Sequence, residues 1–197
     1  MNEIKLKSFI SASALGYSGT NTTFKEKKEE DKSGNCFTSH CCELWEKAAN
    51  SFEKNSIRVV KLRIGIVVGN GTAISKANNI FEKMRLLICF GNGKQAFPWI
   101  HLQDIANLFV ESVSNTLING VYNAVSPEKI DYNQFLNCIK NQNKSYLKIN
   151  IPSIVLRFGM GERADILLHG NDINSEKIQK NFKYKLKYVN ISKAITA

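Results

Sequence analysis

The run from Arg58 to Val68 constrains the fold more than any other part of the sequence. Its apolar positions are nearly continuous and rich in branched side chains: Val59, Val60, Leu62, Ile64, Ile66, Val67 and Val68. A strand with so little alternation suits a sheet covered on both faces, which is typical of parallel sheets flanked by helices. The glycines at 69 and 71 end the run. We therefore expect an α/β protein.

The flanking segments extend this pattern to strand, helix, strand, helix, strand. Phe9–Ala14 is short and apolar, and we predict a buried strand that ends in a loop at Gly16. The spacing of Cys41, Trp45, Ala48 and Phe52 predicts a helix with these four side chains on its buried face.

Three further elements follow. We expect helices over Ile74–Leu87 and from about Asp104, with Asp104 as the N-cap, and a strand over Val121–Val125. Beyond Pro127 the composition changes: Phe135, Leu136 and Ile139 mark a short helix, Pro152 opens another, and lysines become dense. We predict one domain over 1–125 and a small, mainly helical C-terminal subdomain over 126–197.

The formal charge of +10, from 27 Lys+Arg against 17 Asp+Glu, raises the question of a nucleic-acid partner. Only five of the basic residues are arginine, and the lysines are spread along the chain, so we predict no nucleic-acid role. The sharpest local case is the segment 182–188, where aromatic and leucine side chains alternate with lysines. It could stack on a single strand, but an exposed strand whose lysines prevent edge pairing is the better interpretation. No apolar run approaches the roughly 18 residues of a membrane span.

The five cysteines form an odd set without a Cys-x-x-Cys spacing, so neither a zinc site nor a disulfide framework is indicated. We interpret them as free thiols in a reducing compartment and predict a cytoplasmic protein. His40 beside Cys41 and Cys42 is the one local thiol–imidazole cluster, and we favour a structural role for it.

Two glycine patterns have the spacing of a dinucleotide loop. Gly91, Gly93 and Ala96 are followed by Phe97-Pro98-Trp99 where such a loop needs a helix. For Gly159–Ala164 we favour a helix-to-helix turn over a phosphate loop. His101 and Asp104 could form an acid–base pair or bind substrate; equally, Asp104 could cap a helix while His101 packs beside Trp99. No carboxylate pair or metal-ligand cluster is evident in the sequence.

Several short motifs are spread along most of the chain, each occurring once. They are Ser11–Ala14 with Gly16-Tyr17, Trp45-Glu46 with Ala48-Ala49, Arg58–Gly65, Gly91–Gln95, Pro98–His101 with Asp104, Tyr122–Val125 with Pro127, Pro152, Gly159–Glu162, Leu167-Leu168 and Phe182. Together they resemble the NAD(P)-dependent epimerase-like branch of the extended short-chain dehydrogenase/reductases, whose members carry a C-terminal domain of unknown function. The resemblance implies the C-terminal half of a Rossmann-type parallel sheet, beginning just before its fifth strand.

The resemblance also implies NAD or NADP as cofactor and a nucleotide-sugar-like small molecule as substrate. Members of this family hold the cofactor pyrophosphate in a Gly-x-x-Gly-x-x-Gly loop on their first strand, and no such loop occurs in these 197 residues. We therefore expect that this chain alone binds no dinucleotide, that its first strand lies at an open sheet edge, and that its partner is a second copy or a separate N-terminal half.

The family's chemistry rests on a Ser, a Tyr and a Lys, and the resemblance places Ser13 at the serine position. Aligning Glu46 with the family's glutamate puts Thr38 at the tyrosine position and Cys42 at the lysine position, and neither can replace the original group. Tyr17 is the candidate substitute. For the substrate side we predict Lys94, Gln95, Trp99, His101 and Asp104.

We therefore predict a fragment of an NAD(P)-dependent sugar-nucleotide epimerase or reductase-like protein that is inactive alone. The alternative is a non-catalytic remnant, or one partner of a split protein that requires a separate N-terminal half. A basic binding module is a third interpretation, and it predicts salt-dependent retention on nucleic acid.

Overall fold

The computed structural model describes residues 6–20, 26–72, 85–142 and 147–196. Its centre is a parallel sheet whose described strands run in the order β1-β2-β6. These strands are β1 (Ser8–Ala14), β2 (Arg58–Ile64) and β6 (Gly120–Ala124). Five consecutive residues of β2, from Val59 to Arg63, are buried, as the sequence predicts for a strand covered on both faces. The predicted α/β class with a parallel sheet is confirmed.

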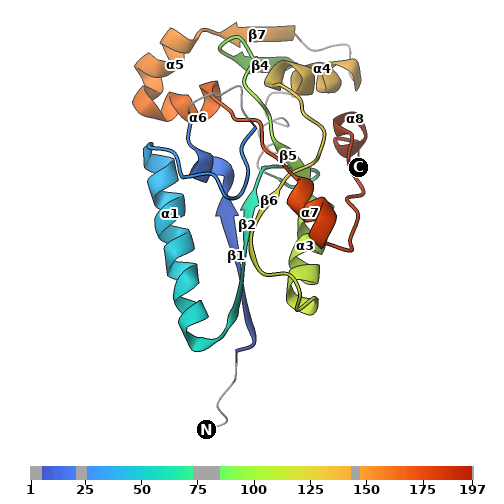
Figure 1. The fold of residues 1–197 in the computed structure, drawn as a ribbon. Helices are drawn as coiled ribbons and strands as arrows, with labels where there is room; N and C mark the ends of the chain where they lie inside the picture. Colours follow the sequence, from blue (N-terminus) through green and yellow to red (C-terminus); the bar gives the residue numbers. More distant parts are fainter. Residues whose placement is uncertain (1–5, 21–25, 73–84, 143–146, 197) are drawn as a thin grey trace.

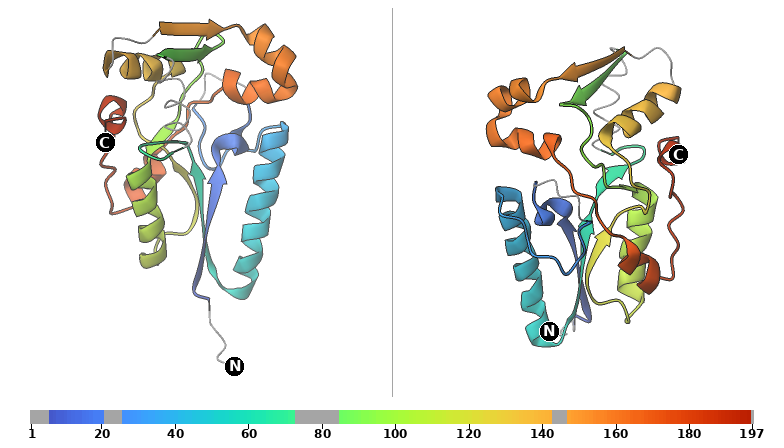
Figure 2. Two further views of the ribbon diagram at one scale, coloured as in Figure 1. Left: turned by 180° about the vertical axis from the view of Figure 1, so that it is seen from behind. Right: turned by 45° about the horizontal axis from the view of Figure 1, so that its top comes forward.

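Helices cover both faces of this sheet, α1 (Phe37–Asn50) on one side and α3 (Leu102–Ser114) on the other (Figures 1 and 2). Beneath α3, Val60 and Leu62 of β2 pack in one core cluster with Ile105 and Leu108. The opposite face of β1 and β2, which α1 covers, carries the polar pairs Ser11–Lys61 and Ser13–Arg63 beside the apolar pair Phe9–Val59. This face is therefore more polar than the one under α3.

The predicted buried side of α1 is wrong for three of its four residues. Cys41, Trp45 and Ala48 are exposed, Trp45 to 51%. Phe52 is half-buried and stacks on Phe9 of β1, but it lies beyond α1, in η2 (Ser51–Asn55). Instead, α1 buries Ser39, Cys42, Glu46 and Ala49. The apolar stripe faces outward because Glu46, on the other side of α1, pairs with Arg63 of β2.

The long apolar run is divided at Gly65 between two sheets. Before it, β2 pairs with β1 and β6; after it, β3 (Ile66–Val68) pairs in parallel with β5 (Trp99–His101). A Cβ at position 65 would lie 2.8 Å from the carbonyl oxygen of Pro98. Glycine is therefore required where the chain changes partners.

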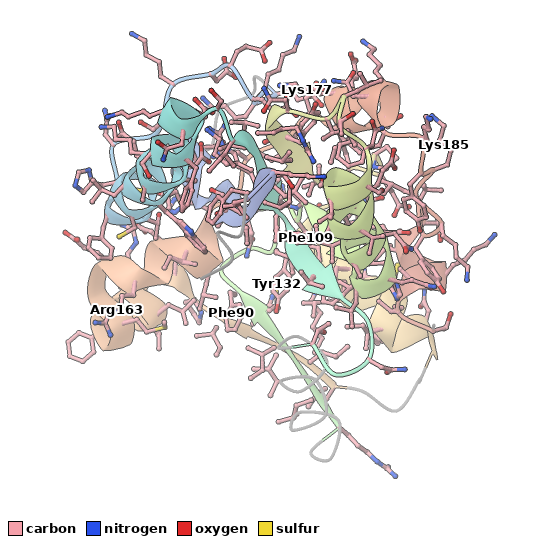
Figure 3. All side chains as sticks on the ribbon, turned by 90° about the horizontal axis from the view of Figure 1, so that it is seen from below. Phe90, Phe109, Tyr132, Arg163, Lys177 and Lys185 are labelled. Atoms are coloured by element: carbon pink, nitrogen blue, oxygen red, sulfur yellow. The ribbon has the colours of Figure 1, made fainter. Side chains whose placement is uncertain are left out.

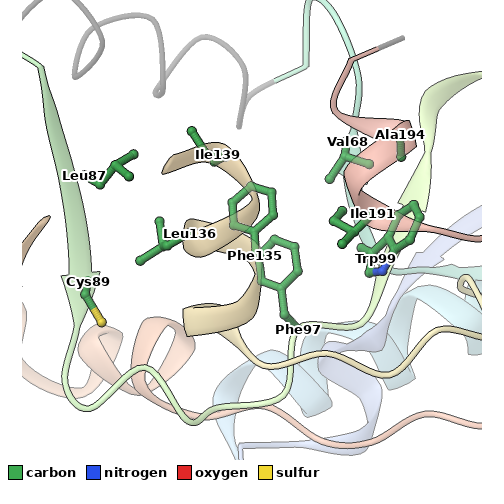
Figure 4. Packing of buried hydrophobic residues seen from close by; sticks show 10 residues of the cluster. All are labelled: Val68, Leu87, Cys89, Phe97, Trp99, Phe135, Leu136, Ile139, Ile191 and Ala194. Carbon is green, nitrogen blue, oxygen red and sulfur yellow. The ribbon is translucent and has the colours of Figure 1, made fainter. Parts of the chain in front are cut away.

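A separate two-stranded parallel sheet pairs β4 (Leu86–Phe90) with β7 (Leu147–Ile151). The helix α4 (Tyr132–Gln142) packs on β4, and the rings of Phe90 and Tyr132 stack at 5.7 Å (Figure 3). Figure 4 shows the buried cluster there: Val68, Leu87, Cys89, Phe97, Trp99, Phe135, Leu136, Ile139, Ile191 and Ala194.

This pairing bears on two predictions. The expected helix over Ile74–Leu87 lies largely outside the described residues, but its end is wrong because Leu86 and Leu87 pair with β7. The strands β4 and β7 also come from opposite sides of the predicted domain boundary at 125/126, so both segments build the small sheet.

Short helices complete the chain. The predicted helix-to-helix turn near Gly159–Ala164 is confirmed, since α5 (Ser153–Met160) continues through the 3-10 turn η3 (Gly161–Ala164) into α6 (Asp165–Leu168). The remaining helices are α7 (Glu176–Asn181), α8 (Ile191–Ala194), η1 (Leu15–Ser18) and η2 (Ser51–Asn55). Among the described residues, no helix is long and apolar enough to cross a membrane.

The segment 182–188 is not the predicted exposed strand. Its alternation holds, since Phe182 is buried and the three lysines are exposed, with Lys185 at the outer edge of the molecule in Figure 3. However, no strand among the described residues pairs with it. Its backbone N–H groups donate to two carboxylates of α3: Lys183 and Tyr184 to Glu111, and Lys187 and Tyr188 to Asp104.

Candidate functional site

A cavity of about 270 Å³ lies at the carboxyl ends of β1 and β2. In open α/β sheets this edge is where ligands bind. Strand ends, the loop after β1, the start of α1 and the α6–α7 connection supply its lining: Ala14, Leu15, Gly16, Gly19, Thr20, Thr38, Ile64, Gly65, Ile66, Ala96, Pro98, Ile166, His169, Gly170, Asn171 and Ile173. Apolar side chains and glycines dominate, and no lysine or arginine of the described residues lines it.

Of the two positions that the resemblance aligns with the family's tyrosine and lysine, one lines this cavity. Thr38 lines it, and Cys42 is buried one helical turn further along α1. A Cβ on Gly16, which also lines the cavity, would lie 3.4 Å from both the Cys42 thiol and the Thr38 side chain. Burial raises the pKa of Cys42. The start of α1 therefore carries a hydroxyl at the cavity and a thiol behind it, where proton transfer would need a phenol and an ammonium group.

Ser13, the predicted serine of the catalytic set, is buried under α1. Its hydroxyl donates to Glu46 Oε1 at 2.8 Å. The same carboxylate receives two bonds from the guanidinium of Arg63, at 2.7 Å from Nε and 2.9 Å from the second nitrogen. All three side chains are nearly inaccessible to solvent, so Ser13 belongs to a buried ion-pair network.

Tyr17 joins this network from the loop after β1. The Arg63 guanidinium carbon lies 3.4 Å from the centroid of the Tyr17 ring, a close cation–π contact. The structure thus brings Ser13 and Tyr17 to the same arginine, but places neither in the cavity lining. Their catalytic role stays a prediction. Sequence reasoning missed Arg63 and Glu46; a charged residue inside the most apolar strand was the signal that could have found them.

The predicted substrate-side residues lie in two other places. Lys94 and Gln95 are in the turn after β4, where Lys94 is exposed. The side-chain amide of Gln95 donates to the carbonyls of Phe90 and Leu167, at 3.2 and 2.8 Å. Gln95 thereby ties the turn to α6, which lies beside the cavity.

Trp99 and His101, on β5, lie in the interior. Trp99 is fully buried in the cluster drawn in Figure 4, and its indole N–H has no partner among the described residues. His101 is the N-cap of α3, because its Nδ1 accepts from the backbone N–H of Gln103 at 3.1 Å. Its ring lies 3.8 Å from that of Tyr188, and burial lowers its pKa.

Asp104 is therefore not the predicted N-cap: α3 begins two residues earlier, and the cap is His101. Asp104 is completely buried and accepts from the Tyr184 hydroxyl at 2.6 Å as well as from the two backbone groups of the C-terminal segment. None of the five predicted substrate-side residues lines the cavity, and their role in binding stays a prediction.

Asn171 is the cavity residue that the sequence did not reveal. Its Nδ2 donates to the backbone oxygens of Gly19 at 2.7 Å and Ser18 at 3.4 Å. Its Oδ1 is buried and has no partner among the described residues. Gly170 before it packs so tightly on Ala96 that a side chain could not be accommodated. A single Gly-Asn pair between helices carries no recognisable motif.

A second cavity of about 720 Å³ adjoins the first at the N-terminus of α1 and shares Thr20, Thr38 and Ile166 with it. Cys36, the N-cap of α1, lines it together with Glu162, Arg163 and Asp165. Burial raises the pKa of Cys36, but hydrogen bonds from Ser39 and Thr38 outweigh it and lower the pKa to about 7. Among the described residues, no group of three or more His, Cys, Asp or Glu side chains could hold a metal ion.

Sequence comparison relates the chain to epimerase family proteins, although no family model matches it. It is 30% identical over 182 residues to the chloroplastic epimerase family protein SDR39U1 homolog of Arabidopsis thaliana, covering 91% of this chain and 52% of that protein. It is 29% identical over 168 residues to epimerase family protein YfhF of Bacillus subtilis, covering 84% and 54%. The chain thus spans about half the length of the curated relatives that it matches.

Solved structures agree. The human epimerase family protein SDR39U1, crystallised with NADPH, superimposes with a TM-score of 0.86 at 26% identity, over 96% of this chain and 64% of that one. A UDP-N-acetylglucosamine 4-epimerase of Methanobrevibacter ruminantium shares the fold, with a TM-score of 0.72 at 20% identity over 96% of this chain and 60% of that one. The fold is that of the short-chain dehydrogenase/reductases, and the chain is a homologue of the epimerase family proteins over about half of their length.

Proposed function

We propose that the chain is the substrate-side part of an NAD(P)-dependent sugar-nucleotide epimerase or reductase-like protein, and that it catalyses no reaction alone. The cavity at the carboxyl ends of β1 and β2 supports the first part. Proteins of this fold were crystallised with UDP-glucose and NAD, and with UDP-glucuronic acid and NAD. A sugar-bearing ligand is thus the best candidate occupant.

The observation that carries the proposal is the chemistry of Thr38 and Cys42, which the resemblance aligns with the family's tyrosine and lysine. Thr38 lines the cavity and the Cys42 thiol lies behind Gly16, which also lines it, but neither side chain could serve as general acid or hold a ribose. The residues present also do not fit a dinucleotide, because the sequence lacks the glycine-rich loop and no lysine or arginine of the described residues lines the cavity. We derive no hydride-transfer step for this chain.

Calorimetry on the purified 197 residues tests the proposal with two ligands, UDP-glucose and NADPH. We expect measurable, weak heat with UDP-glucose, none with NADPH, and no turnover of UDP-glucose with either cofactor form. Micromolar NADPH binding, or turnover by the chain alone, would refute the claim of inactivity. Absence of any UDP-glucose binding would refute the claim of a substrate side.

The open edge of β1 favours a second candidate, a non-catalytic protein that pairs with a separate N-terminal half. Among the described strands, β1 has a neighbour on one side only, so its outer N–H and C=O groups can receive another strand. Hydrogen exchange of the Ser8–Ala14 amides should slow when the N-terminal half of YfhF is added. Unchanged exchange together with UDP-glucose binding favours the first candidate over this one.

Further assignments belong to the same proposal. Ser13 and Tyr17 would lie nearest the reacting centre of a completed protein, and Lys94, Gln95, Trp99, His101 and Asp104 would support the substrate side. We place the protein in the cytoplasm, which suits the five free thiols, and divide it at 125/126. The partner would be a second copy or the N-terminal half, without nucleic acid.

A further inference from the structure

His101 lies where β5 ends and α3 begins, beneath the C-terminal segment 183–188, which runs along α3 between α7 and α8 (Figure 1). Its side chain is buried, and its ring lies 3.8 Å from the ring of Tyr188 in that segment. The next carboxylate along α3, that of Asp104, accepts the backbone N–H groups of Lys187 and Tyr188. The imidazole is thus packed between the start of a helix and the segment that this helix holds.

The hydrogen bonds of His101 fix where its proton lies. Nδ1 accepts from the backbone N–H of Gln103, and a backbone N–H can only donate. The neutral ring therefore carries its proton on Nε2, which is buried and has no partner among the described residues. A second proton would have to go on Nδ1, where it would face the N–H of Gln103 and abolish the N-cap. The imidazolium would thus have two N–H groups and no acceptor for either of them in the described part of the chain.

The surroundings of the ring do not compensate for a positive charge. Two charged groups of the described residues act on it, Asp104 of α3 and Lys187, and their effects are opposite. The positive end of the α3 dipole also disfavours a cation at the N-cap. The other faces are closed by the ring of Tyr188 and by Gly69, where an added Cβ would lie 3.1 Å from Nε2. Burial therefore prevails and lowers the pKa of His101.

We propose that His101 is a pH-sensitive switch: segment 183–188 lies closed on α3 while the imidazole is uncharged, and it is released when the imidazole takes up a proton. The proton is accommodated only after the segment has lifted and water has reached the ring. This inference goes beyond the proposed function and does not depend on it.

The direction of the switch follows from proton linkage. In the open form the ring is hydrated and has the ordinary pKa of histidine, roughly 6.5, whereas its pKa in the closed form is lower. The open form therefore binds the proton more readily. The closed form keeps its full stability above pH 6.5 and loses it as the pH falls toward the lowered pKa, by at most about tenfold in population for each pH unit.

Release of the segment uncovers part of the core. Tyr184 and Leu186 pack against the cluster that contains Ile105 and Leu108 of α3. Lifting them away exposes this apolar face of α3 to solvent. Acidification would thereby open the face of α3 that the segment covers.

The first test measures hydrogen exchange of the Lys187 and Tyr188 amides in the unmodified chain at pH 7.5, 6.5 and 5.5. Protection is corrected for the intrinsic exchange rate at each pH. We expect it to fall by roughly three- to tenfold between pH 7.5 and 5.5, with most of the loss below pH 6.5. Protection that stays constant over this range would overturn the proposal.

Two matched substitutions assign the effect to one ring. His101→Asn keeps a side chain that is well suited to an N-cap but cannot be protonated, so protection should no longer depend on pH in this range. His40→Asn removes an exposed histidine of α1 and should leave the pH dependence as it is in the unmodified chain. The same acid-induced loss in His101→Asn, or its disappearance in His40→Asn, would show that another group acts.

A final measurement needs no variant, so it holds even where His101→Asn fails to fold. The ¹⁵N chemical shifts of the imidazole in the unmodified chain report which nitrogen carries the proton. At pH 7.5 we expect a neutral ring with its proton on Nε2. A proton on Nδ1 at this pH, or a charged ring while the Lys187 and Tyr188 amides stay fully protected, would contradict the switch.

Discussion

At the scale of single residues, the unusual feature is the buried group of Ser13, Glu46 and Arg63. A buried ion pair seldom adds net stability, but breaking one leaves an uncompensated charge and costs about 3–5 kcal/mol. The Arg63 guanidinium reaches three acceptors, since it also donates to the backbone oxygen of Glu29 at 3.1 Å. It joins β2 to α1 and to the loop before α1.

We predict that Glu46→Gln lowers the free energy of unfolding by about 3 kcal/mol, because Arg63 keeps its charge and loses its counter-ion. Urea unfolding measures this. The control is Glu43→Gln on the same helix, where the carboxylate pairs with the exposed Lys47 at 3.2 Å; a loss below about 1 kcal/mol is expected there. Equal losses of unfolding free energy in the two variants would show that the buried ion pair contributes no more to stability than the exposed one.

A second residue-scale prediction concerns Cys36, whose thiol has a pKa lowered to about 7. Alkylation by iodoacetamide, followed peptide by peptide in the mass spectrometer, should show a midpoint near pH 7 at Cys36, because the thiolate is the nucleophile. Thr38→Val removes one of the hydrogen bonds that lower the pKa, so the midpoint should rise. A midpoint near the ordinary thiol value in the unmodified chain would contradict the effect of these hydrogen bonds.

At the scale of elements, α1 shows what periodicity can and cannot predict. The spacing of Cys41, Trp45 and Ala48 correctly indicated a helix. The predicted buried face was wrong, because apolar spacing within a helix does not show that Arg63, on the strand beneath, pairs with Glu46. The run Arg58–Val68 indicated a buried strand, but its division at Gly65 depends on how closely Pro98 approaches. Contacts between distant segments decide both, and no local pattern contains them.

Helix α3 also holds a segment that lies far from it in the sequence. Its two carboxylates, Asp104 and Glu111, bind four backbone N–H groups of segment 183–188. Backbone hydrogen bonds lower the pKa of Glu111, although burial alone would raise it. The segment is thereby fixed as a strap over α3 without belonging to any sheet.

We predict that Asp104→Ala lowers the free energy of unfolding by about 2–3 kcal/mol, since hydrogen bonds to a charged acceptor are lost. The strap should also loosen, and trypsin should cut sooner after its exposed residues Lys183, Lys185 and Lys187. Glu176→Gln serves as control, because the Glu176 side chain is exposed, and it should change neither result. Unchanged cleavage in Asp104→Ala would mean that the strap is held by other contacts.

At the scale of the whole molecule, the sequence predicted the parallel sheet, the succession of β1, α1, β2, α3 and β6, and the homology, but it missed the strands β4, β5 and β7. It also predicted the edge position of β1 among the described strands. It did not predict the cavity, because the lining joins residues 14–66 with residues 166–173, at least 100 positions further along the chain, and with Ala96 and Pro98 between them. Asn171 and Gly19 meet only once the chain has folded.

The two core clusters have one more property in common, which concerns the timing of folding. One is completed by Ile178 and Phe182, the other by Ile191 and Ala194. During synthesis, residues emerge from the ribosome at roughly 5–20 per second, and those that close each core emerge after the other buried residues of the same cluster. The parallel sheet can assemble early, but its helical cover stays incomplete until then. Chaperones that shield apolar surface should therefore bind the nascent chain late into its synthesis.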